Sequence, residues 1–85
     1  MTIVIEIFES PGCQNCGKAT DLLKHIIQKY SLENVQWHKV SVLDEIDYAV
    51  EMGILATPAI AINGQLVFTS LPSEEKFYQE IMKYV

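Results

Sequence analysis

The sequence predicts an α/β fold built on a four-stranded mixed sheet with helices on both faces. Three observations support this fold class. Apolar strand-like runs alternate with helical patterns in the first half of the chain. In the second half, an Asn63-Gly64 turn signal separates two short apolar runs, and a last helical pattern follows them. The predicted element order is therefore β-α-β-α-β-β-α, in which helical crossovers give parallel pairing and the hairpin gives antiparallel pairing.

The first strand is predicted over residues 2–9, a run rich in Ile, Val and Phe with few polar interruptions. Such a run is typical of a central strand that is buried on both faces. Pro11 and Gly12 end this strand. The helix that follows has apolar residues three and four positions apart, which form one stripe: Ala19, Leu22, Leu23, Ile26, Ile27 and Tyr30.

The second strand is predicted over residues 35–42, and its apolar residues alternate irregularly. Val35 and Trp37 share one parity, whereas Val40 and Val42 share the other. We expect an edge strand with a twist or a bulge, because either would account for the switch.

A second, shorter helix is predicted after this strand. Asp44 is its expected N-cap, and Gly53 is expected to end it in the left-handed conformation. Its apolar residues are Ile46, Ala49, Val50 and Met52. The apolar loop that follows, Ile54-Leu55-Ala56, is compatible with two roles, a docking surface for a substrate or packing in the core.

Residues 58–62 and 65–69 are the predicted strands of the hairpin, and they must run antiparallel to each other. The last helix is predicted to start at Pro72-Ser73. Glu74-Glu75 then falls in its first turn, where the helix dipole favours acidic side chains. The residues expected to face the sheet are Phe77, Tyr78, Ile81, Met82 and Val85.

The length and charge of the chain restrict its function. Its 85 residues suffice for one domain, predicted to span residues 1–85. Nucleic acid is not an expected partner, because the net charge is −5 and the six basic residues are scattered. The run Ile3-Val4-Ile5 follows Met1 too closely for a signal peptide, and no apolar run reaches membrane-spanning length. The sequence therefore predicts a cytoplasmic protein without a membrane partner.

Cys13 and Cys16 are the two cysteines of the chain, and two residues separate them at the junction of the first strand and the first helix. Amides at a helix start lack intrahelical partners and the helix dipole is positive there, so a thiolate is favoured over a thiol. We therefore expect Cys13, near the helix cap, to ionise more readily than a free cysteine, with Cys16 one turn further on. Because cytosolic disulfides are usually transient, the pattern favours redox chemistry.

Three other interpretations of the pair stay open. A structural disulfide would close a short loop and would add little stability. A zinc site needs four ligands, and His25 and His38 do not stand at a recognisable ligand spacing. A copper-chaperone-like module also places CxxC after its first strand, although its element order differs. Neither a metal nor another cofactor is expected.

The whole chain resembles the thioredoxin superfamily, and by its size the small thioredoxins and glutaredoxins. The resemblance rests on the CxxC at a strand-to-helix junction, on the element order, and on Ala56-Thr57-Pro58 ahead of the hairpin. It implies the thioredoxin fold and a thiol-disulfide oxidoreductase that reduces protein disulfides without a cofactor.

The resemblance gives the catalytic roles to the two cysteines. Cys13 corresponds to the exposed attacking thiol and Cys16 to the buried resolving thiol. The buried acid that thioredoxins place six residues before the first cysteine has no counterpart, since Ile7 occupies that position. The implied partners are protein disulfide substrates and, for recharging, either glutathione or a reductase such as an NADPH-dependent thioredoxin reductase. A monomer is expected.

The resemblance also implies a substrate-binding set. Pro58 corresponds to the cis-proline that faces the disulfide, and Thr57 to the residue whose backbone pairs with an extended substrate segment. Pro11, Gly12 and Ala56 are the further residues expected to border the substrate.

Overall fold

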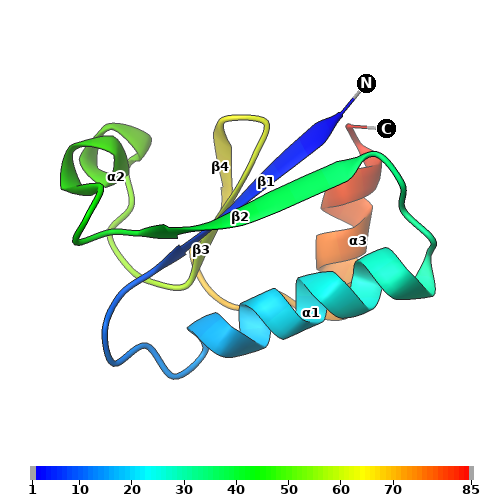
Figure 1. Ribbon diagram of the computed structural model, residues 1–85, viewed down its shortest axis with the longest axis horizontal. Helices are drawn as coiled ribbons and strands as arrows, with labels where there is room; N and C mark the ends of the chain where they lie inside the picture. Colours follow the sequence, from blue (N-terminus) through cyan, green and yellow to red (C-terminus); the bar gives the residue numbers. More distant parts are fainter. Residues whose placement is uncertain (1, 85) are drawn as a thin grey trace.

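The computed structural model describes residues 2–84, and these contain four strands and three helices in the predicted order (Figure 1). The elements are β1 (Ile3–Glu9), α1 (Cys16–Lys29), β2 (Val35–Ser41), α2 (Ile46–Met52), β3 (Ala59–Ile62), β4 (Gln65–Phe68) and α3 (Glu74–Met82). Val85, expected on the sheet-facing side of the last helix, lies outside the described residues. None of the helices within residues 2–84 is long and apolar enough to cross a membrane.

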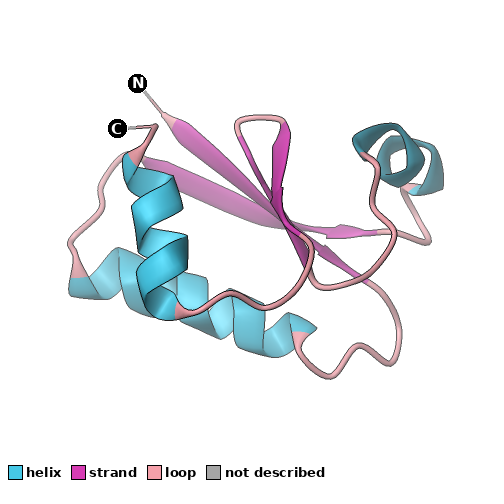
Figure 2. Ribbon diagram, turned by 180° about the vertical axis from the view of Figure 1, so that it is seen from behind, coloured by secondary structure: helices cyan, strands magenta, loops and turns pink. Residues whose placement is uncertain are grey.

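The four strands form one mixed sheet in the order β2-β1-β3-β4. β1 pairs in parallel with β2 on one side and antiparallel with β3 on the other. β3 and β4 are antiparallel around the predicted turn, where Asn63 and Gly64 both have positive φ angles, 51° and 82°. Helices α1 and α3 lie on one face of the sheet, and α2 lies on the other face at one end (Figure 2). The predicted architecture is confirmed.

The central strand β1 is buried on both faces because its alternate side chains enter two clusters. Its isoleucines belong to the larger cluster, together with buried residues of α1 and α3. On the other face, Phe8 belongs to a smaller cluster, whose remaining buried members are Val40, Ala59 and Ala61. Tyr48 and Met52 of α2 pack against this smaller cluster. The main core therefore lies between the sheet and the helix pair α1 and α3.

β2 lies at the edge of the sheet, as predicted, and of the two expected explanations, a twist or a bulge, its pairing with β1 contains no bulge. The two strands keep one continuous register along their whole length. The parity switches because β2 uses both of its faces: Val35 and Trp37 pack against the larger cluster, whereas Val40 belongs to the smaller one. The irregularity in the sheet lies between Ile60 and Ala61, where β3 pairs with β4.

Asp44 is not the N-cap of α2, so this prediction was wrong. The backbone N–H of Glu45 donates to the carbonyl of Ser41, and this turn delays the helix start. Glu45 is the N-cap, although its side chain makes no capping hydrogen bond. Gly53 ends the helix at a φ of +80°, in the left-handed conformation that was predicted.

The predicted start of α3 is confirmed. The Ser73 side chain accepts a hydrogen bond from the backbone N–H of Lys76, and Glu74 and Glu75 lie in the first turn. The helix buries Phe77 and Ile81 against the sheet, in the larger cluster.

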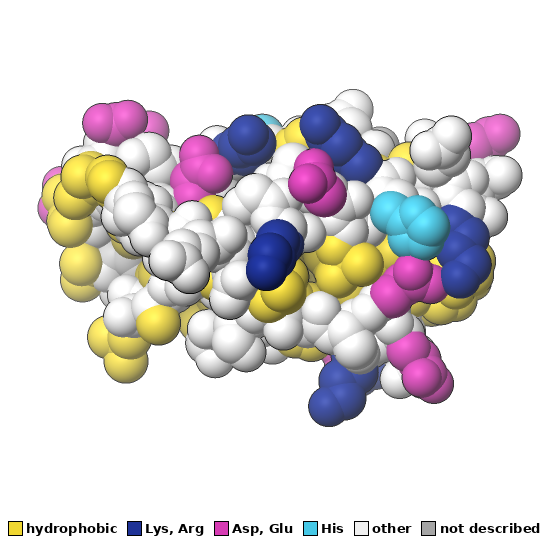
Figure 3. All heavy atoms as spheres, turned by 90° about the horizontal axis from the view of Figure 1, so that it is seen from below, with side chains coloured by type: hydrophobic (Ala, Val, Ile, Leu, Met, Phe, Trp, Pro, Cys, Tyr) yellow, Lys and Arg dark blue, Asp and Glu magenta, His cyan; other side chains and the backbone are white. Residues whose placement is uncertain are grey.

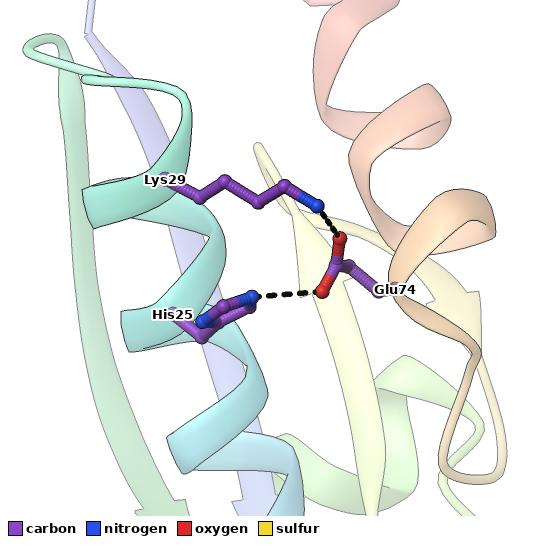
Figure 4. Close-up of polar contacts among 3 residues, drawn as sticks. All are labelled: His25, Lys29 and Glu74. Atoms are coloured by element: carbon purple, nitrogen blue, oxygen red, sulfur yellow. Dashed lines mark hydrogen bonds and ion pairs between the residues drawn. The ribbon is translucent and has the colours of Figure 1, made fainter.

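Glu74 also ties α3 to α1 (Figure 4). Its carboxylate accepts a hydrogen bond from the Lys29 Nζ at 2.6 Å and lies 2.9 Å from the His25 Nε2. The hydrogen bond from Lys29 lowers the pKa of Glu74, and Glu74 raises the pKa of Lys29 in return. Tyr30 and Tyr78 stack with ring centroids 3.8 Å apart. These contacts hold the C-terminal half of α1 against α3.

Candidate active site

The chain between β1 and α1 forms a turn that leads into the cysteine pair. The backbone N–H of Cys13 donates to the carbonyl of Ser10 at 3.2 Å and closes the turn over Pro11 and Gly12. Gly12 has a φ of +78°, a conformation that residues with a side chain rarely adopt. Pro11 and Gly12 thus end β1 as predicted and direct the chain toward the start of α1.

Cys13 and Cys16 form a disulfide, with their Cα atoms 5.6 Å apart. Cys13 is partly exposed, whereas Cys16 exposes only 4% of its surface. The Cys16 Sγ lies 4.0 Å from the carbonyl oxygen of Phe8, near the end of β1. A molecule that approaches from solvent therefore reaches Cys13 more readily than Cys16.

α1 starts later than the sequence analysis expected. Asn15 is the N-cap, so Cys13 lies two residues before the cap, and Cys16 is the first helical residue rather than a residue one turn inside the helix. Asn15 makes no side-chain capping hydrogen bond, and the first turn contains no acidic residue. No carboxylate in the first turn of α1 therefore offsets the partial positive charge at the start of the helix. Once the disulfide is reduced, this end favours a thiolate at the cysteines, because both lie at or just before the start of α1.

The disulfide borders an open hollow of about 370 Å³. The end of β1, the turn, the start of α1 and Ser41 of β2 line it. Among the lining residues are four of the predicted site residues: Pro11, Gly12, Cys13 and Cys16.

The loop before β3 lies against the cysteine turn. The hydroxyl oxygens of Ser10 and Thr57 are 2.7 Å apart and share a hydrogen bond. Ala56 and Thr57 line a second hollow of about 200 Å³, and Ser10 borders both this hollow and that of the disulfide. The Thr57–Pro58 peptide bond is cis, and Pro58 is buried and lines neither of these two hollows. The predicted substrate-binding residues other than Pro58 therefore fall in two hollows that meet at Ser10.

Sequence reasoning missed Glu6, an acidic residue on the α2 face of β1 that exposes only 8% of its surface. It lies in a hollow of about 480 Å³ that shares Glu9 and Ser41 with the hollow of the disulfide. The Tyr48 hydroxyl donates to Glu6, and this hydrogen bond is the main reason that the pKa of Tyr48 is raised to about 12. An acidic residue in the middle of an otherwise apolar stretch of strand was the available signal, because such a residue needs a polar partner when buried.

The described residues offer little to a metal ion. Within residues 2–84, no group of three or more His, Cys, Asp or Glu side chains is arranged to hold one. The site can instead form and break one sulfur–sulfur bond, which transfers two electrons.

The chain matches the family model described as "Thioredoxin domain" over residues 1–83. It is 32% identical over 81 residues to a protein named "Probable Thioredoxin" from Methanothermobacter thermautotrophicus, which covers 95% of this chain and 94% of that protein. It is 31% identical, with the same coverage, to a protein named "Thioredoxin" from Methanocaldococcus jannaschii.

Solved structures agree with these relatives at the level of the fold. The oxidised mitochondrial thioredoxin 3 of Saccharomyces cerevisiae superposes with a TM-score of 0.72 at 22% identity, covering 95% of this chain and 77% of that one. A mutant thioredoxin of Halobacterium salinarum gives a TM-score of 0.78 at 17% identity, covering 96% of this chain and 74% of that one. The arrangement of the sheet and the three helices is the thioredoxin fold.

Proposed function

The chain belongs to the thioredoxin family, and on this premise we propose that Cys13 is its attacking sulfur and Cys16 its resolving sulfur. The protein is a thiol-disulfide oxidoreductase, and it acts on disulfide substrates together with a reductase partner. We further propose that residues 1–85 act as a single domain, as a monomer in the cytoplasm.

The reaction exchanges one disulfide for another. In the reduced protein, the Cys13 thiolate attacks one sulfur of the substrate disulfide, so a mixed disulfide forms and the second substrate sulfur leaves as a thiolate. The Cys16 thiolate then attacks the Cys13 Sγ, which releases the first substrate sulfur and closes the Cys13–Cys16 bond. Two electrons pass from the protein dithiol to the substrate, and the released thiolates take up protons from solvent. No metal or organic group takes part in these steps.

The observation that supports this assignment is the unequal exposure of the two sulfurs. Cys13 is partly exposed at the rim of its hollow, whereas Cys16 exposes 4% of its surface beneath the end of β1. An incoming disulfide meets Cys13 first. Cys16 needs only to reach the neighbouring Cys13, and its burial does not hinder that step.

We place the substrate segment along the two hollows that meet at Ser10. Pro11 and Gly12 border the hollow of the disulfide, and Ala56 and Thr57 border the other. The hydrogen bond between Ser10 and Thr57 joins the two loops, so a segment that lies across them would meet both at a fixed separation. Pro58 supports this surface from a buried position rather than by lining it.

Single cysteine variants test the assignment. Cys16→Ser is expected to attack a protein disulfide and to accumulate as a mixed disulfide at Cys13, because the resolving step is lost. Cys13→Ser is expected to form no adduct and to lose turnover. Peptide mapping of the adduct by mass spectrometry identifies the bonded cysteine. Retained turnover in Cys13→Ser contradicts the assignment. So does an adduct at Cys16 in Cys13→Ser that forms as fast as the adduct at Cys13 in Cys16→Ser.

The recharging partner requires a separate experiment. We propose an NADPH-dependent thioredoxin reductase or glutathione as the electron donor. Reduction of the oxidised protein is measured with each donor in turn. Rapid turnover with one and not with the other assigns the donor, and failure of both contradicts this part of the proposal.

A further inference from the structure

Among the described residues, four large apolar side chains are exposed to solvent. All four belong to α2 or to the loops on either side of it. We call Leu43, Ile46, Val50 and Leu55 the α2 patch; they expose 61%, 55%, 70% and 97% of their surface. The space-filling view shows apolar side chains gathered at the end of the molecule where α2 lies (Figure 3). Exposed apolar groups that cluster in this way mark binding surfaces in soluble proteins.

The α2 patch is not part of the core. Ile46 and Val50 stand four residues apart and so share one face of α2. The face that packs on the sheet carries Tyr48 and Met52, which follow Ile46 and Val50 by two positions and so lie about 160° around the helix from them. Leu55 contributes almost nothing to folding because it is nearly fully exposed. The sequence left two roles open for the loop Ile54-Leu55-Ala56, a docking surface or packing in the core. Leu55 does not pack in the core.

The α2 patch reaches the proposed substrate site without a break. The hollow of about 200 Å³ has Ile46, Val50 and Leu55 on its lining, together with Thr57 and Ser10. Ser10 also borders the hollow of the disulfide. A segment bound across the cysteine turn would therefore place its neighbouring side chains in this hollow.

The charge of the chain is concentrated beside the same patch. Residues 43–57 contain none of the six basic residues but four acidic ones, Asp44, Glu45, Asp47 and Glu51. This segment carries a formal charge of −4 out of −5, so the rest of the chain is nearly neutral. Asp47 and Glu51 each follow a patch residue by one position and so lie about 100° around the helix from it. An acidic stripe thus runs alongside the apolar one.

We propose that the α2 patch selects disulfide substrates in which a bulky apolar side chain and an adjacent Lys or Arg lie close to the cystine. The apolar side chain enters the hollow beside Thr57, and the basic side chain pairs with Asp47 or Glu51. This inference rests on the proposed function, because it assigns the specificity of the same site.

A second copy of the chain fits the α2 patch less well. Stable interfaces contain about 20–30 residues a side, whereas the patch has four. Pairing of two copies through it would also bring two segments of charge −4 together. An anionic lipid surface is opposed by the same charge.

The test compares three synthetic cystine peptides that differ only beside the cystine. The first carries Leu and Lys there, the second Leu and Glu, and the third Ser and Lys. The reduced protein, residues 1–85, is mixed with each peptide, the reaction is quenched with acid, and the second-order rate constant is measured by chromatography. Each constant is divided by that for bis(2-hydroxyethyl) disulfide, which has no side chain to fill the hollow. We expect the Leu-Lys peptide to give the highest ratio.

Three variants then locate the selectivity. Val50→Ser and Leu55→Ser are each expected to lower the ratio for the Leu-Lys peptide roughly three- to tenfold and to leave that for the Ser-Lys peptide nearly unchanged. Glu51→Lys is expected to reduce the preference for the Leu-Lys over the Leu-Glu peptide roughly two- to fivefold, with a smaller effect at high salt. Glu33→Lys is the matched control, since Glu33 is an exposed acid in the loop before β2 and outside residues 43–57. It should preserve the preference.

The outcomes separate this inference from the proposed function. Equal ratios for all three peptides, or equal effects of Glu51→Lys and Glu33→Lys, overturn the inference while reduction itself stands. Failure to reduce any peptide or the small disulfide overturns the proposed function instead. Two further results would assign the patch to another occupant and also overturn the inference. One is a dimer of the parent protein in sedimentation that Leu55→Ser loses; the other is binding of the parent protein to anionic vesicles that Leu55→Ser loses.

Discussion

The Tyr48 hydroxyl lies 2.7 and 2.8 Å from the two carboxylate oxygens of Glu6 and joins α2 to the central strand β1. The His38 Nε2 lies 3.4 Å from the same carboxylate, on the neighbouring strand β2, where His38 is the register partner of Glu6. Ala49 is the one buried residue of α2, and this polar contact adds to the packing of Tyr48 and Met52 against the smaller cluster. It therefore also positions the α2 patch.

Removal of the Tyr48 hydroxyl should destabilise the protein. Glu6 exposes only 8% of its surface, and Tyr48→Phe removes the phenol hydroxyl that donates to its carboxylate. A lost hydrogen bond to a charged group costs about 1.5–3 kcal/mol of unfolding free energy. Urea unfolding of the variant and the parent measures the difference at pH 7. An unchanged unfolding free energy would show that water replaces the phenol without cost.

The same contact predicts a pH dependence in the alkaline range. The pKa of Tyr48 is raised to about 12 in the folded protein, first by its hydrogen bond to Glu6 and then by burial. Because the folded pKa exceeds the ordinary value of about 10, the neutral phenol stabilises the fold fully below pH 10 and loses this contribution between about pH 10 and 12. Absorbance titration of tyrosinate should show one late-titrating group that Tyr48→Phe removes. A titration curve identical in the two proteins would contradict the assignment.

The ion pairs between α1 and α3 predict the opposite dependence at acid pH. Lys29 lowers the pKa of Glu74, so this carboxylate stabilises the fold above its ordinary pKa and loses the contribution as the pH falls through its lowered value. Glu74→Gln should therefore lower the thermal midpoint near pH 7 and have a smaller effect at acid pH or at high salt, because the groups are exposed. Thermal unfolding at several pH values measures this. A difference that persists at acid pH would point to a cause other than the ion pairs.

Two glycines should respond to alanine with opposite signs. Gly53 ends α2 at a φ of +80°, so Gly53→Ala is expected to cost about 1–2 kcal/mol of unfolding free energy. Gly17 lies inside α1, where an added Cβ has no heavy atom within 4 Å. Gly17→Ala should stabilise the protein by up to about 0.5 kcal/mol, the lower end of the value for a helix interior, because Gly17 is the second residue of α1. Urea unfolding measures both, and equal signs would contradict the backbone argument.

Much of the fold could be predicted because local signals and tertiary needs agree. The stripe of α1, the Asn63-Gly64 turn and the Ser73 cap each specify one structure by themselves, and the sheet follows from their order. The Cys13–Cys16 pair was identifiable for the same reason, since its spacing carries its chemistry. The cis form of the Thr57–Pro58 bond was implied only by the family resemblance.

The remaining features depend on contacts that the local sequence does not contain. The parity switch in β2 reflects two clusters on opposite faces, and a strand bulge would leave the same pattern in the sequence. The burial of Glu6 needed Tyr48, which is 42 residues away. Val50 has the spacing of a core residue, yet α2 has no second layer to cover it.

The central claim is that the two sulfurs of the site are chemically unequal, with Cys13 as the reactive one. Brief alkylation of the reduced protein near pH 7 with a limiting amount of iodoacetamide, followed by peptide mapping, tests it most directly. We predict modification almost entirely at Cys13, because Cys13 is partly exposed before the uncapped start of α1 and Cys16 is buried. Equal modification of the two cysteines, or faster modification of Cys16, would contradict the account.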